Sequence, residues 1–354
     1  MFATGLNIGV LGGSRFIGHH LTEALVAAGH SVTLFNRGRT PPPRPLAGDV
    51  RRVRGDRNAP GDLEAFLDRS YDAVFDLSGY TPAHVEPLTS ERCRDRIGHY
   101  IFCSTSSVYR IPPPCPCPES APRVDVAGHY GGNKAHAEDV LLRASRESAW
   151  PVTIVRPNGV FGPFDAAQTG YVFARLSRSL PVVVGPTDGR RQNMLYVGDL
   201  VAVYLRILGN QAAHGQVYNV AGDAATTAEE LVALCAQAAG GVQPRVRVVN
   251  RWPYKHLRVG FQWPRHDLVL ENSRVRHDLG IRFTPLLEGL TSTWQWLSST
   301  ADHLQLELSR GERFVDEEGK IPFWVRAVLW MDDLTFTSPV RRRLGPIVRK
   351  ARGA

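Results

Sequence analysis

The stretch of sequence that decides the fold is IGVLGGSRFIGHHL, residues 8–21. A short apolar run leads into a glycine-rich turn at Gly12, and an amphipathic helix is expected to begin near Phe16. Gly12 permits a tight turn, Gly13 lets the backbone approach a phosphate, and Gly18 lets the helix pack closely on the strand. The exposed N–H groups and the dipole of a helix that begins here favour an anion. This stretch therefore predicts a turn that binds the pyrophosphate of a dinucleotide.

Outward from this turn, short β-rich runs alternate with amphipathic stretches, a pattern typical of a parallel sheet covered by helices on both faces. Strands are expected at Leu6–Leu11, Ser31–Phe35, Val50–Arg54, Asp72–Leu77, His99–Ser104 and Val152–Val155. Helices are expected at Phe16–Ala28, Asp62–Asp68 and His129–Ser148, and near residues 165–180, 199–208, 227–239 and 286–300. The fold class is α/β, a Rossmann-like doubly wound parallel sheet with a smaller C-terminal α/β substrate domain and a C-terminal extension.

We divide the chain into a dinucleotide-binding Rossmann domain over residues 1–155, a substrate-binding region over 156–300 that is partly interleaved with it, and an extension over 301–354. The extension holds the apolar segment IPFWVRAVLWM, Ile321–Met331, and a basic tail. Three roles remain open for it: a helix docked on the parent domain with a disordered basic end, a lid or dimer contact, or a surface for a membrane or nucleic acid.

Composition excludes several classes of protein. Of the 354 residues, 43% are hydrophobic and 21% are charged, which excludes a wholly disordered chain. No apolar run approaches the roughly 20 residues needed to span a bilayer, and the N-terminus does not resemble a secretory signal. Five cysteines make no disulfide framework, and Cys115 and Cys117 form a lone CxC motif without a second metal-binding pair. We therefore expect a cytoplasmic protein without a metal site.

The formal net charge of +8 is concentrated in two windows. Residues 37–57 carry seven arginines against two aspartates, and residues 341–354 carry six basic residues and no acid. The remaining chain is slightly acidic, so the net charge by itself gives little support to a nucleic-acid partner.

The end of the second strand, LFNRGR, bears on the choice of cofactor. The position that usually holds an acidic residue for the ribose hydroxyls is Asn36, and Arg37 and Arg39 follow it. Arg15, in the glycine turn, is either a solvated surface residue or a cation beside the adenosine ribose. Without a carboxylate and with these arginines nearby, a 2′-phosphate should be tolerated, which favours NADP over NAD.

Asp56, after the third strand, is expected either to accept a hydrogen bond from the adenine amino group or to cap the strand end. Ser78 and Gly79, after the fourth strand, are expected to line the far side of the cofactor.

The segment HYGGNK, residues 129–134, places Tyr130 and Lys134 four residues apart on a helix, so that their side chains share one face. A nearby ammonium lowers the pKa of a phenol and makes tyrosine usable as a proton donor or acceptor. The fifth strand ends in the hydroxyl-rich run STSSVY, residues 104–109, which can hydrogen-bond a substrate oxygen. The combination predicts proton transfer to or from a substrate hydroxyl.

The chain resembles the extended short-chain dehydrogenases/reductases of the NAD-dependent epimerase/dehydratase superfamily. The matching stretches are GGSRFIG, STSSVY, YGGNK, VRPNGVFGP, LYVGDL and YNVAG, spread over about residues 6–300. The resemblance implies a catalytic triad of Thr105, Tyr130 and Lys134. Tyr130 would be the acid/base, Lys134 would hold the nicotinamide ribose and lower the Tyr130 pKa, and Thr105 would orient the substrate oxygen.

Carried over onto this sequence, the resemblance extends the candidate sites. Asn158 and Phe161 lie where the family lines the nicotinamide and the substrate pocket, although Pro157 and Pro163 beside them are equally well explained as turn residues. His84, His129 and His136 are better explained as surface histidines. Candidate cofactor-binding residues are Gly12, Gly13, Ser14, Arg15, Phe16, Ile17, Gly18, Asn36, Arg37, Arg39, Asp56, Ser78, Gly79, Tyr130, Lys134, Pro157 and Asn158. Candidate substrate-binding residues are Thr105, Ser106, Ser107, Phe161 and Gln192.

Departures from the family narrow the chemistry. Sugar-nucleotide 4,6-dehydratases carry Asp-Glu directly after the catalytic threonine, and this chain has Ser106 and Ser107 there, so dehydration is not expected. The arginine that usually pairs with a nucleotide diphosphate is replaced by Gln192, with Arg190 and Arg191 adjacent. The segment YTPAHVEPL, residues 80–88, replaces the usual helix start after the fourth strand.

The expected function is hydride transfer at a secondary alcohol or ketone of a sugar-like or polyfunctional small molecule. Epimerase and ketoreductase both remain open, and a homodimer is expected. GGSRF, FNRG and GDR resemble an atypical branch that includes the chloroplast stem-loop RNA-binding proteins, so nucleic-acid binding is the alternative. A regulatory protein that senses its cofactor is a third hypothesis. The complete triad argues against both, and neither nucleic acid nor a membrane is the expected partner.

Overall fold

A computed structural model describes residues 5–39, 42–46, 48, 50–59, 61–165, 168–184, 188–248 and 263–299. These residues form two compact units. Among the described residues, the first unit draws on the ranges Met1–Asp165, Gly189–Thr227 and Pro264–Thr293, and the second on the ranges Ala166–Asp188 and Ala228–Trp263 and on residues 294–299. The extension over 301–354, with its apolar segment and basic tail, lies outside the described residues.

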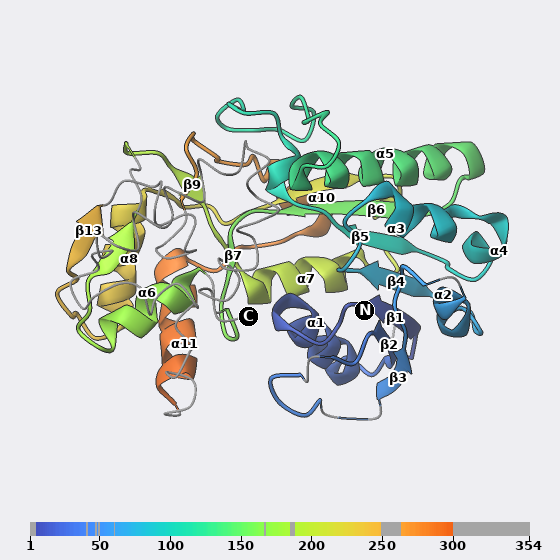
Figure 1. The fold of residues 1–354 in the computed structure, drawn as a ribbon, viewed down its shortest axis with the longest axis horizontal. Helices are drawn as coiled ribbons and strands as arrows, with labels where there is room; N and C mark the ends of the chain where they lie inside the picture. Colours follow the sequence, from blue (N-terminus) through green and yellow to red (C-terminus); the bar gives the residue numbers. More distant parts are fainter. Residues whose placement is uncertain are drawn as a thin grey trace, which may run out of the picture. The chain divides into compact units, whose positions relative to one another are not determined.

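The first unit is built on a seven-stranded sheet of order β11-β6-β5-β4-β1-β2-β3, in which every neighbouring pair is parallel (Figure 1). Its strands are β1 (Asn7–Leu11), β2 (Ser31–Asn36), β3 (Val50–Arg54), β4 (Ala73–Asp76), β5 (Tyr100–Cys103), β6 (Val152–Pro157) and β11 (Val217–Val220). The strand order reverses at β1, and in such sheets ligands bind beyond the carboxyl ends of the strands at this point. The predicted Rossmann-like α/β class is confirmed.

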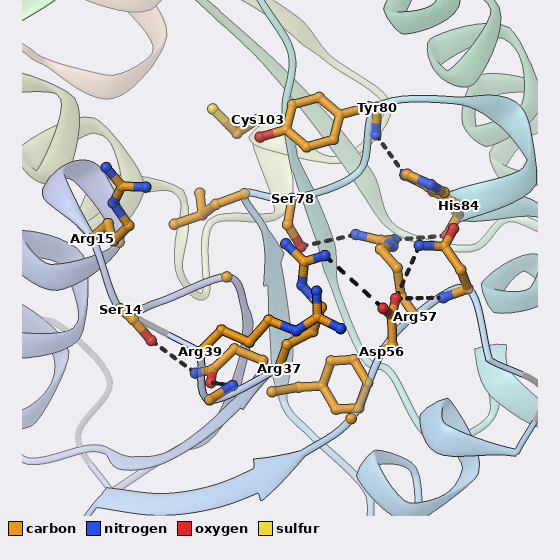
Figure 2. Close-up of a pocket in the computed structure, with 18 of the residues that line it drawn as sticks. Ser14, Arg15, Arg37, Arg39, Asp56, Arg57, Ser78, Tyr80, His84 and Cys103 are labelled. Carbon is orange, nitrogen blue, oxygen red and sulfur yellow. Dashed lines mark hydrogen bonds and ion pairs between the residues drawn. The ribbon is translucent and has the colours of Figure 1, made fainter. Parts of the chain in front are cut away.

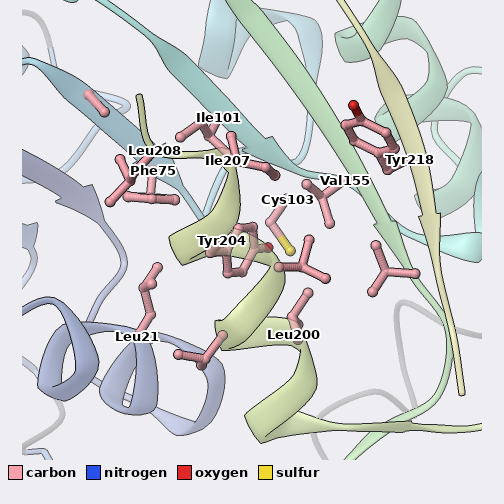
Figure 3. Packing of buried hydrophobic residues seen from close by; sticks show 14 of the residues in the cluster. Leu21, Phe75, Ile101, Cys103, Val155, Leu200, Tyr204, Ile207, Leu208 and Tyr218 are labelled. Carbon is pink, nitrogen blue, oxygen red and sulfur yellow. The ribbon is translucent and has the colours of Figure 1, made fainter. Parts of the chain in front are cut away.

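Helices cover both faces of this sheet because both faces of its inner strands are apolar. Alternate residues of one strand point to opposite faces, so that Phe75 joins one buried cluster and Val74 the other. The first cluster packs against α1 (Phe16–Ala27), α7 (Val197–Ile207) and α10 (Ser273–Leu279). The second packs against α2 (Asp62–Phe66) and α5 (Tyr130–Ser148). Figure 3 shows the first cluster, where Tyr204 of α7 lies beneath Cys103 at the end of β5.

The connection from β4 to β5 contains only short helical pieces: α3 (Pro82–Val85), η1 (Glu86–Thr89) and α4 (Glu91–Arg94). Pro82 is the first residue of α3 and Pro87 the second residue of η1, and neither has the backbone N–H that would continue a helix from the residues before it. The departure from the family pattern noted at YTPAHVEPL is therefore visible as a broken helix.

Smaller elements complete the first unit. The short strands β7 (Val160–Phe161) and β10 (Leu195–Tyr196) pair in parallel, and β9 (Gln192–Asn193) and β12 (Ala225–Thr226) pair antiparallel. The remaining pieces are η2 (Ser106–Val108), η3 (Gln211–Ala213) and the first part of α11 (Leu286–Ser298).

The second unit contains α6 (Thr169–Leu176), α8 (Ala228–Ala238), the parallel pair β8 (Val182–Val184) and β13 (Val246–Val248), and the end of α11. Within the described ranges, no helix is long and apolar enough to cross a membrane.

Candidate active site

The glycine turn between β1 and α1 is closely packed. Gly12 has a φ of +98°, which a side chain would strain, and a Cβ at Gly18 would lie 2.6 Å from the Gly12 carbonyl oxygen. The predicted role of Gly18 in close helix packing therefore agrees with the structure. At Gly13, a Cβ would lie 2.5 Å from the Leu34 side chain. Its lack of a side chain serves packing against the core.

A cavity of about 530 Å³ opens at this turn, at the carboxyl ends of β1, β2 and β4 (Figure 2). Arg15 is the N-cap residue of α1 and makes no side-chain hydrogen bond to the helix start. Figure 2 shows Tyr80 and Cys103 at one end of the cavity and Arg37 and Arg39 at the other. The predicted cofactor-binding residues that line it are Gly12, Ser14, Arg15, Phe16, Ile17, Gly18, Asn36, Arg37, Arg39, Asp56 and Ser78.

The end of β2 is tied to the glycine turn by Asn36. Its side-chain amide donates to Ser14 Oγ at 2.8 Å and its side-chain oxygen accepts from the Gly38 N–H at 2.9 Å. The Arg37 side chain is 56% exposed and its guanidinium lies 4.0 Å from an Asp56 oxygen. The structure thus brings the uncharged Asn36 and an accessible arginine to one side of the cavity.

Asp56 caps its own loop, accepting from the Asn58 N–H at 3.1 Å and from the Asn58 amide at 2.9 Å. These hydrogen bonds lower the pKa of the Asp56 carboxyl. Of the two roles expected for Asp56, the cap is the one that the described contacts show.

Arg57 is a residue of this cavity that sequence reasoning missed. Its guanidinium forms two hydrogen bonds of 2.8 Å to the carboxylate of Asp76, at the end of β4. It also donates to Ser78 Oγ at 3.0 Å and to the His84 carbonyl oxygen at 2.6 Å. Burial disfavours a charge on Asp76, but the Arg57 charge and hydrogen bonds outweigh it and hold the Asp76 pKa at about 2. Arg57 therefore joins the loop after β3 to the loop after β4.

The structure brings Thr105, Tyr130 and Lys134 together. Tyr130 is the first residue of α5, and the Thr105 side chain lies close enough to its phenol to lower the phenol's pKa. Lys134 lies one turn further along α5, is 2% exposed and donates from Nζ to the Cys103 carbonyl oxygen at 2.5 Å. The strand-end hydroxyl, the phenol and the ammonium thus meet at the carboxyl end of β5.

The pKa of Tyr130 differs from the sequence-based expectation. Partial burial raises it to about 12, although the nearby Thr105 side chain works in the opposite direction. The Lys134 ammonium lies 4.4 Å from the centre of the Phe102 ring, and burial lowers its pKa. The phenol of Tyr130 is therefore protonated at neutral pH in the protein without ligand.

Tyr80 is a second missed residue of the site. It follows β4, lines the cavity and is 46% exposed. The centre of its ring lies 6.2 Å from that of Tyr130 and 5.2 Å from Lys134 Nζ. Tyr80 therefore connects the cavity at the glycine turn with the residues at the end of β5. Its backbone N–H donates to His84 Nδ1 at 3.1 Å, so His84 also belongs to this wall.

Several predicted residues are buried behind the site. Asn158 is 1% exposed and accepts from Ser106 Oγ at 2.9 Å, while its amide donates to backbone oxygens of Asn193 and Leu268 at 3.0 Å. Gln192 is 5% exposed and Phe161 is 1% exposed. The described lining of the cavity includes none of these three, nor Gly13, Gly79, Pro157, Tyr130 or Lys134.

Two further histidines lie near the start of α5. His129 is an exposed N-cap residue of α5, and His136 pairs with Asp125 at 2.7 Å. In the part of the chain that the structure describes, no three His, Cys, Asp or Glu side chains are grouped so that they could hold a metal ion.

The fold and the site define a Rossmann-type protein with a dinucleotide cavity and a Thr-Tyr-Lys constellation. A sequence model of the NAD dependent epimerase/dehydratase family matches residues 8–221, and the chain belongs to this family. Its members depend on NAD(P) and include epimerases and reductases.

Two relatives illustrate this range. The chain is 30% identical over 302 residues to the chloroplast stem-loop binding protein of 41 kDa b from Arabidopsis thaliana, covering 80% of this chain and 77% of that protein. It is 27% identical over 261 residues to the 2'-dehydrokanamycin reductase of Streptomyces kanamyceticus, covering 71% and 72%.

Solved structures share the fold. An epimerase from Methanothermobacter thermautotrophicus superposes with a TM-score of 0.73 at 17% identity, covering 86% of this chain and 95% of that one. The UDP-glucuronic acid 4-epimerase of Bacillus cereus, solved with NAD, has a TM-score of 0.69 at 18% identity, with coverage of 84% and 98%.

Proposed function

We propose that this protein transfers a hydride at a secondary alcohol or ketone of a sugar-like small molecule, as a ketoreductase or an epimerase. The observation that carries the proposal is that Tyr130 and the buried Lys134 both lie beside the Tyr80 ring, with the Thr105 side chain close enough to the Tyr130 phenol to lower its pKa. Tyr80 links these residues to the cavity at the glycine turn, so the proton-transfer group and the dinucleotide cavity belong to one site.

The residues present fit a nicotinamide dinucleotide. In the glycine turn, Gly12 has a φ of +98° and lines the cavity, and the N-terminus of α1 beside it has no side-chain cap. Arg15, Arg37 and Arg39 line the cavity with cations where the acidic residue for the ribose is replaced by Asn36. This supports NADP as the cofactor, because arginine matches the geometry of a phosphate. When bound, the nicotinamide exchanges a hydride with a substrate carbon.

The protein's own groups handle the oxygen of the substrate. Thr105 orients that oxygen by a hydrogen bond, and Tyr130 gives a proton to a ketone oxygen or takes one from an alcohol. Because the pKa of Tyr130 is about 12, the phenol holds its proton at neutral pH and is ready to donate it. This protonation state supports the reductive direction. Lys134 lies beneath the site, with its Nζ 4.4 Å from the centre of the Phe102 ring.

A 4,6-dehydratase is not what we propose. Elimination of water needs an additional acid and base beside the catalytic threonine, and Ser106 and Ser107 occupy those positions. Ser106 is buried, and its hydroxyl is engaged with Asn158.

Mass spectrometry of the native purified protein, followed by cofactor exchange and an NADPH-oxidation assay with ketosugars, tests the proposal. NADP that exchanges freely and turnover of a ketone would support a reductase, and tightly retained NAD(H) would support an epimerase. A protein that binds neither dinucleotide would contradict the proposal.

Nucleic-acid binding is the second candidate. Arg52 and Arg54 are exposed on β3, the edge strand of the sheet, and the Arabidopsis relative is named for binding a stem-loop. Exposed cations along an edge suit a phosphate backbone. RNA that co-purifies, and a stem-loop affinity lost in Arg52→Glu/Arg54→Glu with NADP affinity retained, would favour this candidate.

A further inference from the structure

A buried carboxylate lies behind the residues of the site. Glu138 is 0% exposed and stands on α5 one turn after Lys134 and two turns after Tyr130. Its Oε1 accepts from Ser104 Oγ at 2.5 Å and from Arg156 Nε at 3.0 Å. Its Oε2 accepts from Arg156 Nη2 at 2.6 Å and from Arg123 Nη1 at 2.9 Å. Both oxygens are therefore fully used by partners inside the protein.

The partners of Glu138 reach both ends of the hydroxyl-rich run. Ser104, directly before Thr105, is bound to the carboxylate itself. Tyr109, four residues after Thr105, is reached through Arg156, whose Nη1 donates to the Tyr109 hydroxyl at 2.9 Å. That hydroxyl in turn donates to Asn219 Oδ1 on β11 at 2.5 Å. One carboxylate on α5 thus fixes the segment that carries Thr105.

The network around Glu138 affects how Thr105 is placed relative to Tyr130. Thr105 and Tyr130 stand on two different elements, the end of β5 and the start of α5. The contact between Ser104 and Glu138 joins the same two elements, one residue away from Thr105 and on the helix of Tyr130. Proton transfer depends steeply on such placement, since a shift of about 1 Å can cost about a hundredfold in rate.

We propose that Glu138, with Arg156 and Ser104, forms a positioning network that sets Thr105 against Tyr130 for proton transfer. The inference rests on the proposed function, which gives Thr105 and Tyr130 their roles. The described lining of the cofactor cavity stops at Cys103 on this strand and includes none of the three network residues. Damage to the network should therefore lower kcat and leave cofactor binding intact.

The test uses Ser104→Ala, which removes one hydroxyl and leaves the ion pairs of Glu138 in place. We expect kcat to fall about tenfold, with the Kd of the cofactor changed less than about twofold and with recovery in Ser104→Thr, which restores a hydroxyl. The matched control is Ser145→Ala on α5, the helix of Glu138. The Ser145 hydroxyl donates to the Trp150 carbonyl oxygen at 2.7 Å. The control should keep kcat. Equal kcat in Ser104→Ala and the control, or losses of kcat that follow the losses in melting temperature, would overturn the proposal.

Hydrogen exchange separates this inference from the proposed function. Amide exchange of a peptide that covers residues 104–109 should quicken in Ser104→Ala and stay unchanged in Ser145→Ala, and this readout needs no substrate. If the wild type turns over no alcohol or ketone, the proposed function fails, and the exchange result still decides whether the network orders the Thr105 segment. Unchanged exchange would overturn the positioning role.

Discussion

The Arg57 guanidinium and the Asp76 carboxylate form a bidentate ion pair, with both N···O distances at 2.8 Å, beneath the cofactor cavity. The carboxylate also accepts from the Tyr100 hydroxyl at 2.6 Å and from the backbone N–H groups of Ser78 and Gly79. The pair thus fixes the loop after β4, which forms one wall of the cavity. Because both side chains of the pair are buried, the removal of one charge destabilises the protein strongly, since the other charge would then be buried without a partner.

Asp76→Asn should therefore destabilise the protein by about 3–5 kcal/mol near neutral pH. The folded-state pKa of Asp76 is about 2, below the ordinary value of 3.8, so the stabilisation is complete above pH 4 and is lost as the pH falls toward 2. Urea unfolding of the wild type and of Asp76→Asn at pH 7 and at pH 3 measures the difference between their free energies of unfolding. This difference should be smaller at pH 3. Asp68→Asn, at the exposed Arg51–Asp68 pair, is the control and should change little. A difference in the free energy of unfolding that is the same at both pH values would contradict the lowered pKa of Asp76.

Arg37→Ala should weaken NADP binding about tenfold, because it removes one charged hydrogen-bond donor to a phosphate, and should affect NAD binding much less. Titration calorimetry with both cofactors measures the two affinities. Arg52→Ala, an exposed arginine of β3 outside the described cavity lining, serves as the control and should leave both unchanged. An equal loss for NADP and NAD would remove the argument for a 2′-phosphate site.

Tyr130→Phe should lower turnover by about a hundredfold or more, because only the transferable proton is removed. Cofactor affinity should stay within about twofold, since the ring remains and Tyr130 does not line the described cavity. Steady-state kinetics and a cofactor titration separate the two effects. The control is Tyr218→Phe on β11. This change removes a hydroxyl that donates to the Asp278 carboxylate at 3.3 Å. Near-normal turnover in Tyr130→Phe would refute the role of Tyr130.

The pH dependence of turnover should differ between the two directions. Oxidation of an alcohol needs the ionised phenol, and below a pKa of about 12 the ionised fraction of Tyr130 rises roughly tenfold per pH unit. Reduction of a ketone needs the protonated phenol, which predominates throughout this range. Initial rates from pH 7 to pH 9 should therefore rise for oxidation and stay level for reduction. A rise in both directions would point to a different titrating group.

Six of the seven strands of the sheet, β1 to β6, could be predicted to within about two residues, because their patterns are local. The expected strand at Val50–Arg54 and the helix at Phe16–Ala28 match β3 and α1 closely. β11 and α10 were not predicted: four residues of strand and seven of helix carry little periodicity, and their burial comes from packing on distant elements.

The residues of the candidate site also fall into two groups, those that local sequence patterns identify and those that depend on contacts between distant segments. The glycine turn and the Tyr130–Lys134 pair are set by local spacing, so the sequence identified them. Arg57 is one of seven arginines in its window, and only its ion pair with Asp76 at the end of β4 distinguishes it. The raised pKa of Tyr130 likewise comes from partial burial among groups distant in sequence, and a helical spacing of four contains no measure of burial.

The order in which the strands enter the sheet also has a consequence for biosynthesis. β6 ends at Pro157, and its outer neighbour β11 begins only at Val217, after the chain has passed through the first stretch of the second unit. Until β11 has left the ribosome, β6, whose six residues are all buried in the finished protein, is an open apolar edge. Such edges pair readily with other chains, so the growing polypeptide is most vulnerable to aggregation during this interval. The same late strand carries Asn219, the hydrogen-bond partner of Tyr109, so the hydroxyl-rich segment gains its last anchor only when the sheet closes.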